Sequence, residues 1–315
     1  MLGETNGACT GLILSGGGAR AAYQVGVLSV LAELLPAGAS NPFPVICGTS
    51  AGAINALALA TNAQDFGGGV ERLQQVWSAF SCDQVYRSDW PGVTAQAWRW
   101  IRANLLGVPS SQPTAMLDNA PLRNLLQRTL HFGQIDEALQ AGVLQAVSVS
   151  AFGYQSAESV SFYQGRDRIQ PWSRHRRVGV QTRLGLEHLM ASSAIPLVFP
   201  PVQLNREWFG DGAVRQQAPI SPALHLGANR VLVIGVSDNL ANQPAGGRRG
   251  PRLRAALPPT LAQIGGHLLS STFVDNLEAD IELLERMNKL AGYLPVGSRM
   301  NGKGLRQGEV EVISP

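Results

Sequence analysis

The chain has 315 residues, of which 45% are hydrophobic and 15% are charged, and its formal net charge is +3. This is the composition of a globular protein with enough apolar residues for a large core, so it excludes a disordered chain. The small net charge gives no reason to expect a nucleic-acid partner, and no run of 18 apolar residues predicts a membrane-spanning helix.

Residues 1–10 are interpreted as an N-terminal extension without a signal peptide, because they contain neither a basic segment nor a long apolar run. The three cysteines, Cys9, Cys47 and Cys82, are an odd number without close spacing, which suits a reducing compartment. No Cys/His spacing resembles a zinc site. We therefore expect a cytoplasmic protein without a bound metal.

A glycine-rich loop follows the first apolar run. Residues 12–14 predict a strand, residues 15–20 read Ser-Gly-Gly-Gly-Ala-Arg, and residues 21–35 have helical spacing. Glycines between a strand and a helix let backbone N–H groups approach an anion closely. That anion is either a nucleotide phosphate or an oxygen that becomes charged during a reaction.

The nucleotide interpretation rests on Gly16-x-Gly18-x-x-Ala21, which fits a dinucleotide fingerprint. The fingerprint also needs an acidic residue at the end of the second strand. The second strand is predicted at residues 45–47 and is followed by Gly48 and Thr49, with no acid. The sequence therefore favours an oxyanion hole over a dinucleotide site.

The second strand runs into the sequence Gly48-x-Ser50-x-Gly52, and an Ala/Leu-rich helix is predicted over residues 51–60. This arrangement holds a serine on a sharp turn at the end of a strand. The first N–H groups of the helix then point towards whatever the serine attacks. Ser50 is a candidate nucleophile, and an ordinary turn of small residues is the alternative.

The middle of the chain is less regular. Residues 62–70, with glycines at 67–69, are interpreted as a linker before a helix at 71–80. Residues 82–114 carry three of the six tryptophans beside arginines. A lid or membrane-interface insertion and a helix packed on the core are both consistent with this stretch.

Further elements follow in alternation. The pattern predicts helices at 118–130, 135–141 and 184–190, strands at 143–151 and 159–163 that form a hairpin or lie side by side, and a buried parallel strand at 231–236. The basic run at 174–177 is interpreted as a solvated loop, with binding of phospholipid head groups as the alternative. The alternation of strands and helices predicts an α/β fold with a mostly parallel sheet.

An acidic residue stands in a second distinctive loop, Asp211-Gly212-Ala213. Asp-Gly alone is usually a turn. Here a run of small residues and prolines at 191–202 precedes it, which indicates a tightly constrained passage. Asp238, after the strand at 231–236, is a rival acidic candidate without a glycine loop beside it.

The last part of the chain differs in composition. Residues 241–259 are rich in Gly, Pro and Arg and are interpreted as a flexible connector. Residues 260–315 are interpreted as a C-terminal helical region, with helical periodicity over 260–290 and a strand at 309–314. A strand at that point leads us to expect that the natural chain continues.

Four stretches, in this order, resemble the pattern of the patatin-like phospholipases. They are a Gly-Gly-Gly-x-Arg loop, a Gly-x-Ser-x-Gly elbow, an Ala-Ser-x-Ala-x-Pro-x-x-Phe-x-Pro run and an Asp-Gly-Gly/Ala loop. The resemblance spans roughly Gly11 to Val236. This chain departs from the pattern at Ala21, Ala213 and Gln217, where the family often has Gly, Gly and Asn.

The resemblance implies a three-layer α/β/α sandwich with a mostly parallel central sheet, and a catalytic domain over residues 11–240. It implies a Ser–Asp dyad with Ser50 as nucleophile and Asp211 as base. It also implies oxyanion donors at Gly16, Gly17, Gly18 and Ala51, with Arg20, Gly48, Gly52 and Gly212 in supporting positions.

The activity implied is hydrolysis of acyl esters in phospholipids, lysophospholipids or other lipids, without a metal or organic cofactor and with peripheral contact at the inner membrane surface. An acyltransferase and a non-catalytic lipid-binding protein are the alternatives. The acyltransferase needs a histidine base, and no motif surrounds any histidine of this chain: His131, His175, His188, His225 and His267.

Overall fold

The computed structural model describes residues 9–87, 115–216, 219–236 and 309–315. Several predictions lie outside these ranges: the aromatic stretch at 88–114, Gln217, Asp238, the connector at 241–259 and the helical periodicity at 260–290. None of the helices in the described ranges is long and apolar enough to cross a membrane.

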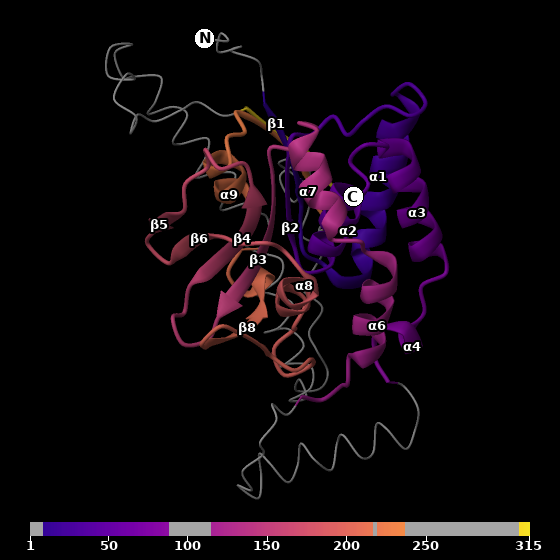
Figure 1. The fold of residues 1–315 in the computed structure, drawn as a ribbon. Helices are drawn as coiled ribbons and strands as arrows, with labels where there is room; N and C mark the ends of the chain where they lie inside the picture. Colours follow the sequence, from indigo (N-terminus) through magenta and orange to yellow (C-terminus); the bar gives the residue numbers. More distant parts are fainter. Residues whose placement is uncertain (1–8, 88–114, 217–218, 237–308) are drawn as a thin grey trace, which may run out of the picture.

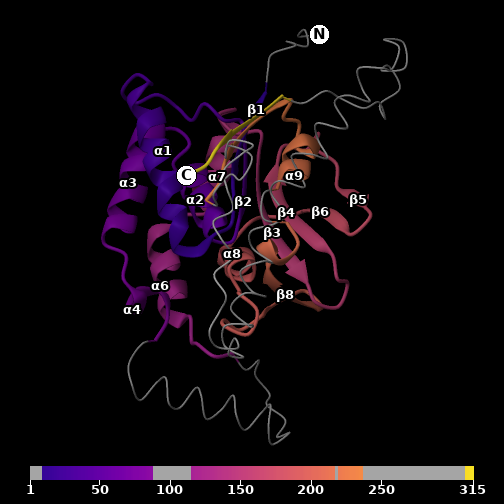
Figure 2. The ribbon, with the colours of Figure 1, turned by 180° about the vertical axis from the view of Figure 1, so that it is seen from behind.

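The described strands form one sheet in the order β10-β9-β1-β2-β3-β4-β6-β5. Its parallel part consists of β10 (Glu309–Ile313), β9 (Arg230–Ile234), β1 (Thr10–Leu14), β2 (Val45–Thr49) and β3 (Ala146–Gly153). Beyond β3 lie β4 (Ser159–Gly165), β6 (Arg177–Gln181) and β5 (Trp172–Arg174). A branch from β3 holds β8 (Glu207–Asp211) and β7 (Val202–Leu204). Figure 2 shows the terminal strand β10, in yellow, at the edge of the sheet.

Helices cover both faces of the sheet (Figure 1). One face carries α1 (Ala22–Glu33), α2 (Ala51–Thr61), α3 (Phe66–Ser78), α4 (Cys82–Val85), α6 (Ala120–Thr129), α7 (Gly133–Gln140) and α8 (Leu186–Ser192). The other face carries α9 (Ile220–His225). Two short 3-10 helices, η1 (Gly18–Ala21) and η2 (Gly212–Val214), follow β1 and β8.

The central strands are apolar on both faces because both faces are covered. Leu12 and Leu14 of β1 are buried with α1 and α2, whereas Ile13 between them is buried with α9. This alternation confirms the α/β fold with a mostly parallel sheet. The carboxyl ends of β1 and β2 meet at one edge of the sheet, which is where ligands bind in such folds.

The strands predicted at 143–151 and 159–163 are confirmed as an antiparallel pair, β3 and β4. Strand β8 also joins β3 in antiparallel fashion, with Asp211 opposite Ala151. Because β3 is also the parallel neighbour of β2, this pairing carries Asp211 towards the residue that follows β2.

The interpretation of residues 67–69 as a linker is wrong, because these glycines form the first turns of α3. Asp65 caps the helix, with its Oδ1 accepting a hydrogen bond of 3.0 Å from the N–H of Gly68. Gly69 lies against Asn62 so closely that an added Cβ would be 2.8 Å from the Asn62 Cβ. Within the helix, Gly69 therefore allows close packing on Asn62, and Gly68 leaves room for the capping carboxyl group of Asp65.

We expect Phe66→Ala to lower the free energy of unfolding by about 3–5 kcal/mol, because it leaves a cavity at the start of α3. Phe66 is fully buried and its ring contacts Phe43 edge-on at a centroid distance of 6.2 Å. Urea unfolding followed by circular dichroism measures the loss. Leu34→Ala is the control, since Leu34 is 76% exposed and should change stability by less than about 0.5 kcal/mol. Equal losses in both variants would contradict this assignment of the core.

Candidate active site

Ser50 occupies the turn between β2 and α2 in an unusual backbone conformation. Its φ is 54° and its ψ is −127°, a region that non-glycine residues adopt at a cost of about 1–3 kcal/mol. The surrounding backbone enforces this turn. A Cβ on Gly52 would lie 2.3 Å from the carbonyl oxygen of Leu14, and one on Gly48 would lie 2.5 Å from the carbonyl oxygen of Gly52. Gly52 lets the start of α2 approach the end of β1 this closely, and Gly48 lets it approach the end of β2.

The side chains of Ser50 and Asp211 meet at this turn. Ser50 Oγ donates a hydrogen bond of 2.6 Å to Asp211 Oδ2. Asp211 is fully buried and Ser50 is only 5% exposed. The structure thus brings together the two residues that the sequence singled out as nucleophile and base, although 161 positions separate them.

Buried hydrogen bonds hold the Asp211 carboxyl group from the other side. Its Oδ1 accepts a hydrogen bond of 2.8 Å from the N–H of Ala213. The backbone N–H of Asp211 donates to the carbonyl oxygen of Ala194 at 2.8 Å. Burial raises the pKa of Asp211 to about 7, against the lowering effect of the hydrogen bonds from Ser50 and Ala213. A carboxylate with such a pKa accepts a proton far more readily than one in water.

The glycine loop after β1 lies beside Ser50. A Cβ added to Gly16 would be 3.3 Å from the Ser50 Cβ. Gly17 packs against Val236, and Gly18 has a φ of +58°. The backbone N–H of Arg20 closes the loop on the carbonyl oxygen of Gly17 at 3.3 Å, while the Arg20 side chain is exposed.

Two further predicted positions, Ala51 and Gly212, follow Ser50 and Asp211 directly in the chain. Ala51 is the first residue of α2, and the N–H groups at the start of a helix have no partner within the helix. Gly212 packs against β3, where an added Cβ would be 2.2 Å from the carbonyl oxygen of Ser150. Ser50 therefore lies between the glycine loop on one side and the start of α2 on the other.

Ser192 was not predicted as a site residue. Its Oγ accepts a hydrogen bond of 2.9 Å from the N–H of Ser50 and donates one of 2.6 Å to the carbonyl oxygen of Ser150. It is fully buried at the end of α8. Ser192 therefore fastens the strained turn to β3. The only signal in the sequence is its place in the small-residue run before Asp211.

Gln24 and Asn55 hold both ends of the glycine loop. Neither was predicted from the sequence as a site residue. Gln24 Nε2 donates to the carbonyl oxygens of Ser15 and Ile234 at 2.9 and 3.1 Å. Asn55 Nδ2 donates to Gln24 Oε1 at 2.9 Å and to the carbonyl oxygen of Ala21 at 3.2 Å. A buried amide in an apolar helix has to find partners, so Gln24 and Asn55 in such helices were the available signal.

The four histidines in the described ranges form their contacts away from Ser50 Oγ. His188 Nδ1 accepts a hydrogen bond from the N–H of Gly185, and burial lowers the pKa of His188. His225 stacks on Trp172. His131 and His175 are exposed. Within the part of the chain that the structure describes, the side-chain partner of Ser50 Oγ is Asp211. His267 and Asp238 lie outside that part.

The part of the chain that carries these motifs also matches a known family. A family model described as patatin-like phospholipase matches residues 12–224, which is more than half of the chain. The chain belongs to the patatin-like phospholipase family. The motifs that carry the resemblance, from the glycine loop to the Asp211 loop, all lie within the matched range or at its N-terminal border.

Two individual proteins are similar to this family member. A cGAMP-activated phospholipase from Pseudomonas aeruginosa is 27% identical over 215 residues, covering 68% of this chain and 55% of the relative. The crystal structure of VipD from Legionella pneumophila is 16% identical with a TM-score of 0.44, covering 74% of this chain and 51% of VipD. The chain thus spans about half the length of each.

We expect Asp211→Asn to gain stability relative to the wild type as the pH rises. The folded state holds the Asp211 proton up to about pH 7, whereas the unfolded state releases it near pH 3.9. Between these values the unfolded wild type binds fewer protons, so wild-type stability falls with rising pH, while asparagine does not titrate.

Urea unfolding of both proteins between pH 5 and pH 8 measures this effect. The difference in unfolding free energy should move in favour of Asp211→Asn by about 1–3 kcal/mol over this range and stay level above it. A difference that does not vary with pH would show that the Asp211 pKa is not raised.

Proposed function

We propose that the chain is a serine acyl hydrolase that cleaves acyl esters of lipids, with Ser50 as nucleophile and Asp211 as general base. The observation that carries this proposal is the 2.6 Å hydrogen bond from Ser50 Oγ to a fully buried carboxyl group. The family's phospholipase character supports the reaction class and the lipid substrate.

In the first half of the reaction, Asp211 Oδ2 takes the proton of Ser50 as Oγ bonds to the ester carbonyl carbon. The carbonyl oxygen becomes an oxyanion, and the N–H groups of the Gly16–Gly18 loop and Ala51 stabilise it. Loss of one such donor typically costs about 2.7–4 kcal/mol in the barrier. The ester C–O bond then breaks, and the leaving alcohol takes the proton from Asp211.

In the second half, a water molecule gives a proton to Asp211 and attacks the carbonyl carbon of the acyl-serine. The bond to Ser50 Oγ breaks, the proton returns to Ser50, and the fatty acid leaves. Both halves need Asp211 to be unprotonated at the start. A carboxylate with a pKa of about 7 is half ionised at neutral pH, and efficient proton transfer is favoured when the pKa lies near the working pH.

The substrates we propose are phospholipids and lysophospholipids, hydrolysed in the cytoplasm at the inner surface of the membrane. The name of the relative from Pseudomonas aeruginosa, a cGAMP-activated phospholipase, supports the phospholipid class. An acyltransferase would use a histidine base, and none of the four described histidines is hydrogen-bonded to Ser50 Oγ. Water is therefore the proposed acyl acceptor.

Ser50→Ala and Asp211→Asn should each lower kcat/KM for p-nitrophenyl butyrate by about 10³-fold or more, because each removes a group that acts on the reacting atoms. Hydrolysis rates and labelling by a fluorophosphonate measure the effect, with circular dichroism as the check on folding. Ser78→Ala, an exposed substitution on α3, is the control and should match the wild type. An active Asp211→Asn variant would assign the base to another residue, such as His267 or Asp238.

The pH dependence of kcat/KM should follow the titration of Asp211. The ionised carboxylate is the active form, so the rate should rise with pH, with a midpoint near 7 and a tenfold fall for each pH unit well below it. Rates with p-nitrophenyl butyrate from pH 5 to pH 9 test this. A rate that is already level from pH 5 upwards, as expected for an ordinary aspartate pKa of about 3.9, would contradict the role of burial.

A further inference from the structure

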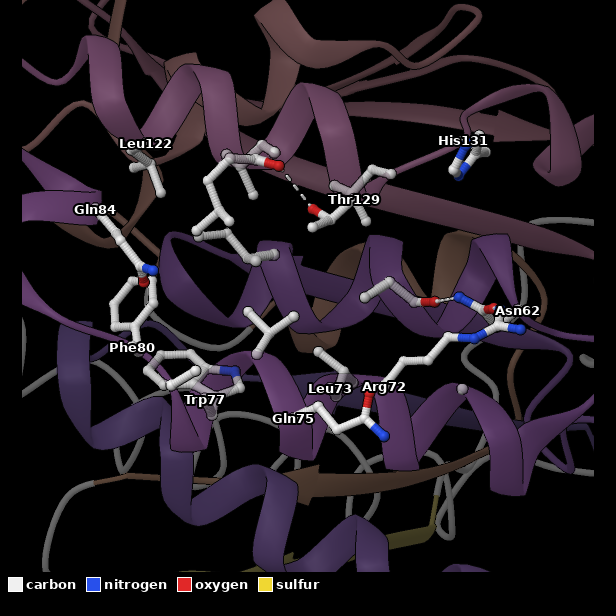
Figure 3. Close-up of a pocket in the computed structure, with 18 of the residues that line it drawn as sticks. Asn62, Arg72, Leu73, Gln75, Trp77, Phe80, Gln84, Leu122, Thr129 and His131 are labelled. Atoms are coloured by element: carbon white, nitrogen blue, oxygen red, sulfur yellow. Dashed lines mark hydrogen bonds between the residues drawn. The ribbon is translucent and has the colours of Figure 1, made fainter.

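A groove of about 650 Å³ runs between α3 and α6 and has α2 as its floor (Figure 3). This volume lies within the usual range of about 300–1,000 Å³ for small-molecule sites. The groove belongs to the helical face of the sheet, whereas Asp211 approaches Ser50 from the strands β3 and β8. Its residues are separate from those that bond to Ser50 and Asp211.

The floor of the groove is aligned with the nucleophile. It consists of Ile54, Ala58 and Asn62, which lie four residues apart on one face of α2. Ser50 precedes Ile54 by the same four residues, at the start of the helix. With a rise of 1.5 Å per residue, Ile54 lies about 6 Å and Asn62 about 18 Å from Ser50 along the helix axis.

The chemistry of the walls changes along this line. Leucine and valine side chains of α3 and α6 line the groove, and the rings of Trp77 and Phe80, 5.1 Å apart, lie together with Gln84 and Leu122 at one end. Trp77 Nε1 donates to Asn55 Oδ1 at 2.8 Å, which places this end beside the first turns of α2. The opposite end is polar, with Asn62, Arg72 and His131 (Figure 3).

We propose that this groove is the subsite for the hydrocarbon chain of the acyl group that Ser50 attacks, and that its polar end limits the chain length. This inference rests on the proposed acyl hydrolase activity. A chain that leaves Ser50 along α2 passes the Trp77 and Phe80 rings and the leucines first, and reaches Asn62 and Arg72 after about 18 Å. Short acyl groups would not reach far into the groove, whereas long ones would fill it.

The charges in the groove favour a hydrocarbon chain over an anionic ligand. Among the described lining residues, Arg72 is the one arginine and there is no lysine. The Arg72 guanidinium donates to Asn62 Oδ1, so it is part of the polar end. An anionic occupant would be expected to gather several cations, as phosphate sites do.

The test narrows the groove and leaves the reacting groups unchanged. Val76→Trp places a large ring in the α3 wall, and Leu125→Trp does so from α6. Gln74→Trp is the matched control, because Gln74 is an exposed residue of α3 that does not line the groove. We expect both wall variants to lower kcat/KM for p-nitrophenyl laurate about tenfold or more, with the rate for p-nitrophenyl butyrate kept within about twofold. Gln74→Trp should match the wild type on both esters.

The pattern of losses separates the possible outcomes. If the wall variants hydrolyse p-nitrophenyl laurate at the wild-type rate, the assignment of the groove as the acyl-chain subsite is wrong. Equal losses on both esters would also contradict it, because they would place the effect on the chemistry near Ser50. A wild type that hydrolyses neither ester would overturn the proposed function itself.

Chain binding then tests the groove without catalysis. Ser50→Ala protein titrated with the fluorescent fatty acid cis-parinaric acid should bind it, and adding Val76→Trp should weaken binding about tenfold. Arg72→Gln, also made in the Ser50→Ala protein, tests the alternative of an anion site. If Arg72→Gln weakens binding and Val76→Trp does not, the groove is an anion site and the assignment is overturned.

Discussion

The Asp211 carboxyl group lies fully buried at 2.6 Å from Ser50 Oγ, and the fold has to hold it there without water. Loss of hydration disfavours the charged form, so the position that makes Asp211 a useful base also opposes folding at neutral pH. Pairing of β8 with β3 fixes the backbone of Asp211, and the N–H of Ala213 partly replaces the lost water. The rest of the site is arranged around this dry carboxyl group.

The backbone around Ser50 is held with equal firmness. Gly52 lets α2 start against the end of β1, Ser192 fastens the N–H of Ser50 to β3, and the amides of Gln24 and Asn55 fix the glycine loop at both ends. A hydrogen-bond donor stabilises a developing charge best when it does not have to reorient. The strain in Ser50 persists because these contacts leave the turn no alternative.

The sequence was informative where the candidate site residues stand in contiguous motifs. Ser50, the Gly16–Gly18 loop and Asp211 stand within short motifs, and the central strands were predicted from short apolar runs. Contacts between distant segments were not visible. Ser192 bonds to Ser50 across 142 positions, and residues 67–69 became helical because of the Asp65 cap and close packing on Asn62. The groove needs three helices to be in place before it exists, so no local pattern predicts it.

The position of β10 has a consequence for how the protein is made. Strand β9 lies between β1 and β10, and β10 comes from residues 309–313, far behind β9 in the chain. During synthesis, β9 is complete long before the strand that covers its outer edge leaves the ribosome. An uncovered strand edge is a template for pairing with another chain. Shortening the chain before residue 309 would make the apolar strand β9 the edge of the described sheet in place of β10, which carries Glu309 and Glu311, and would therefore promote aggregation.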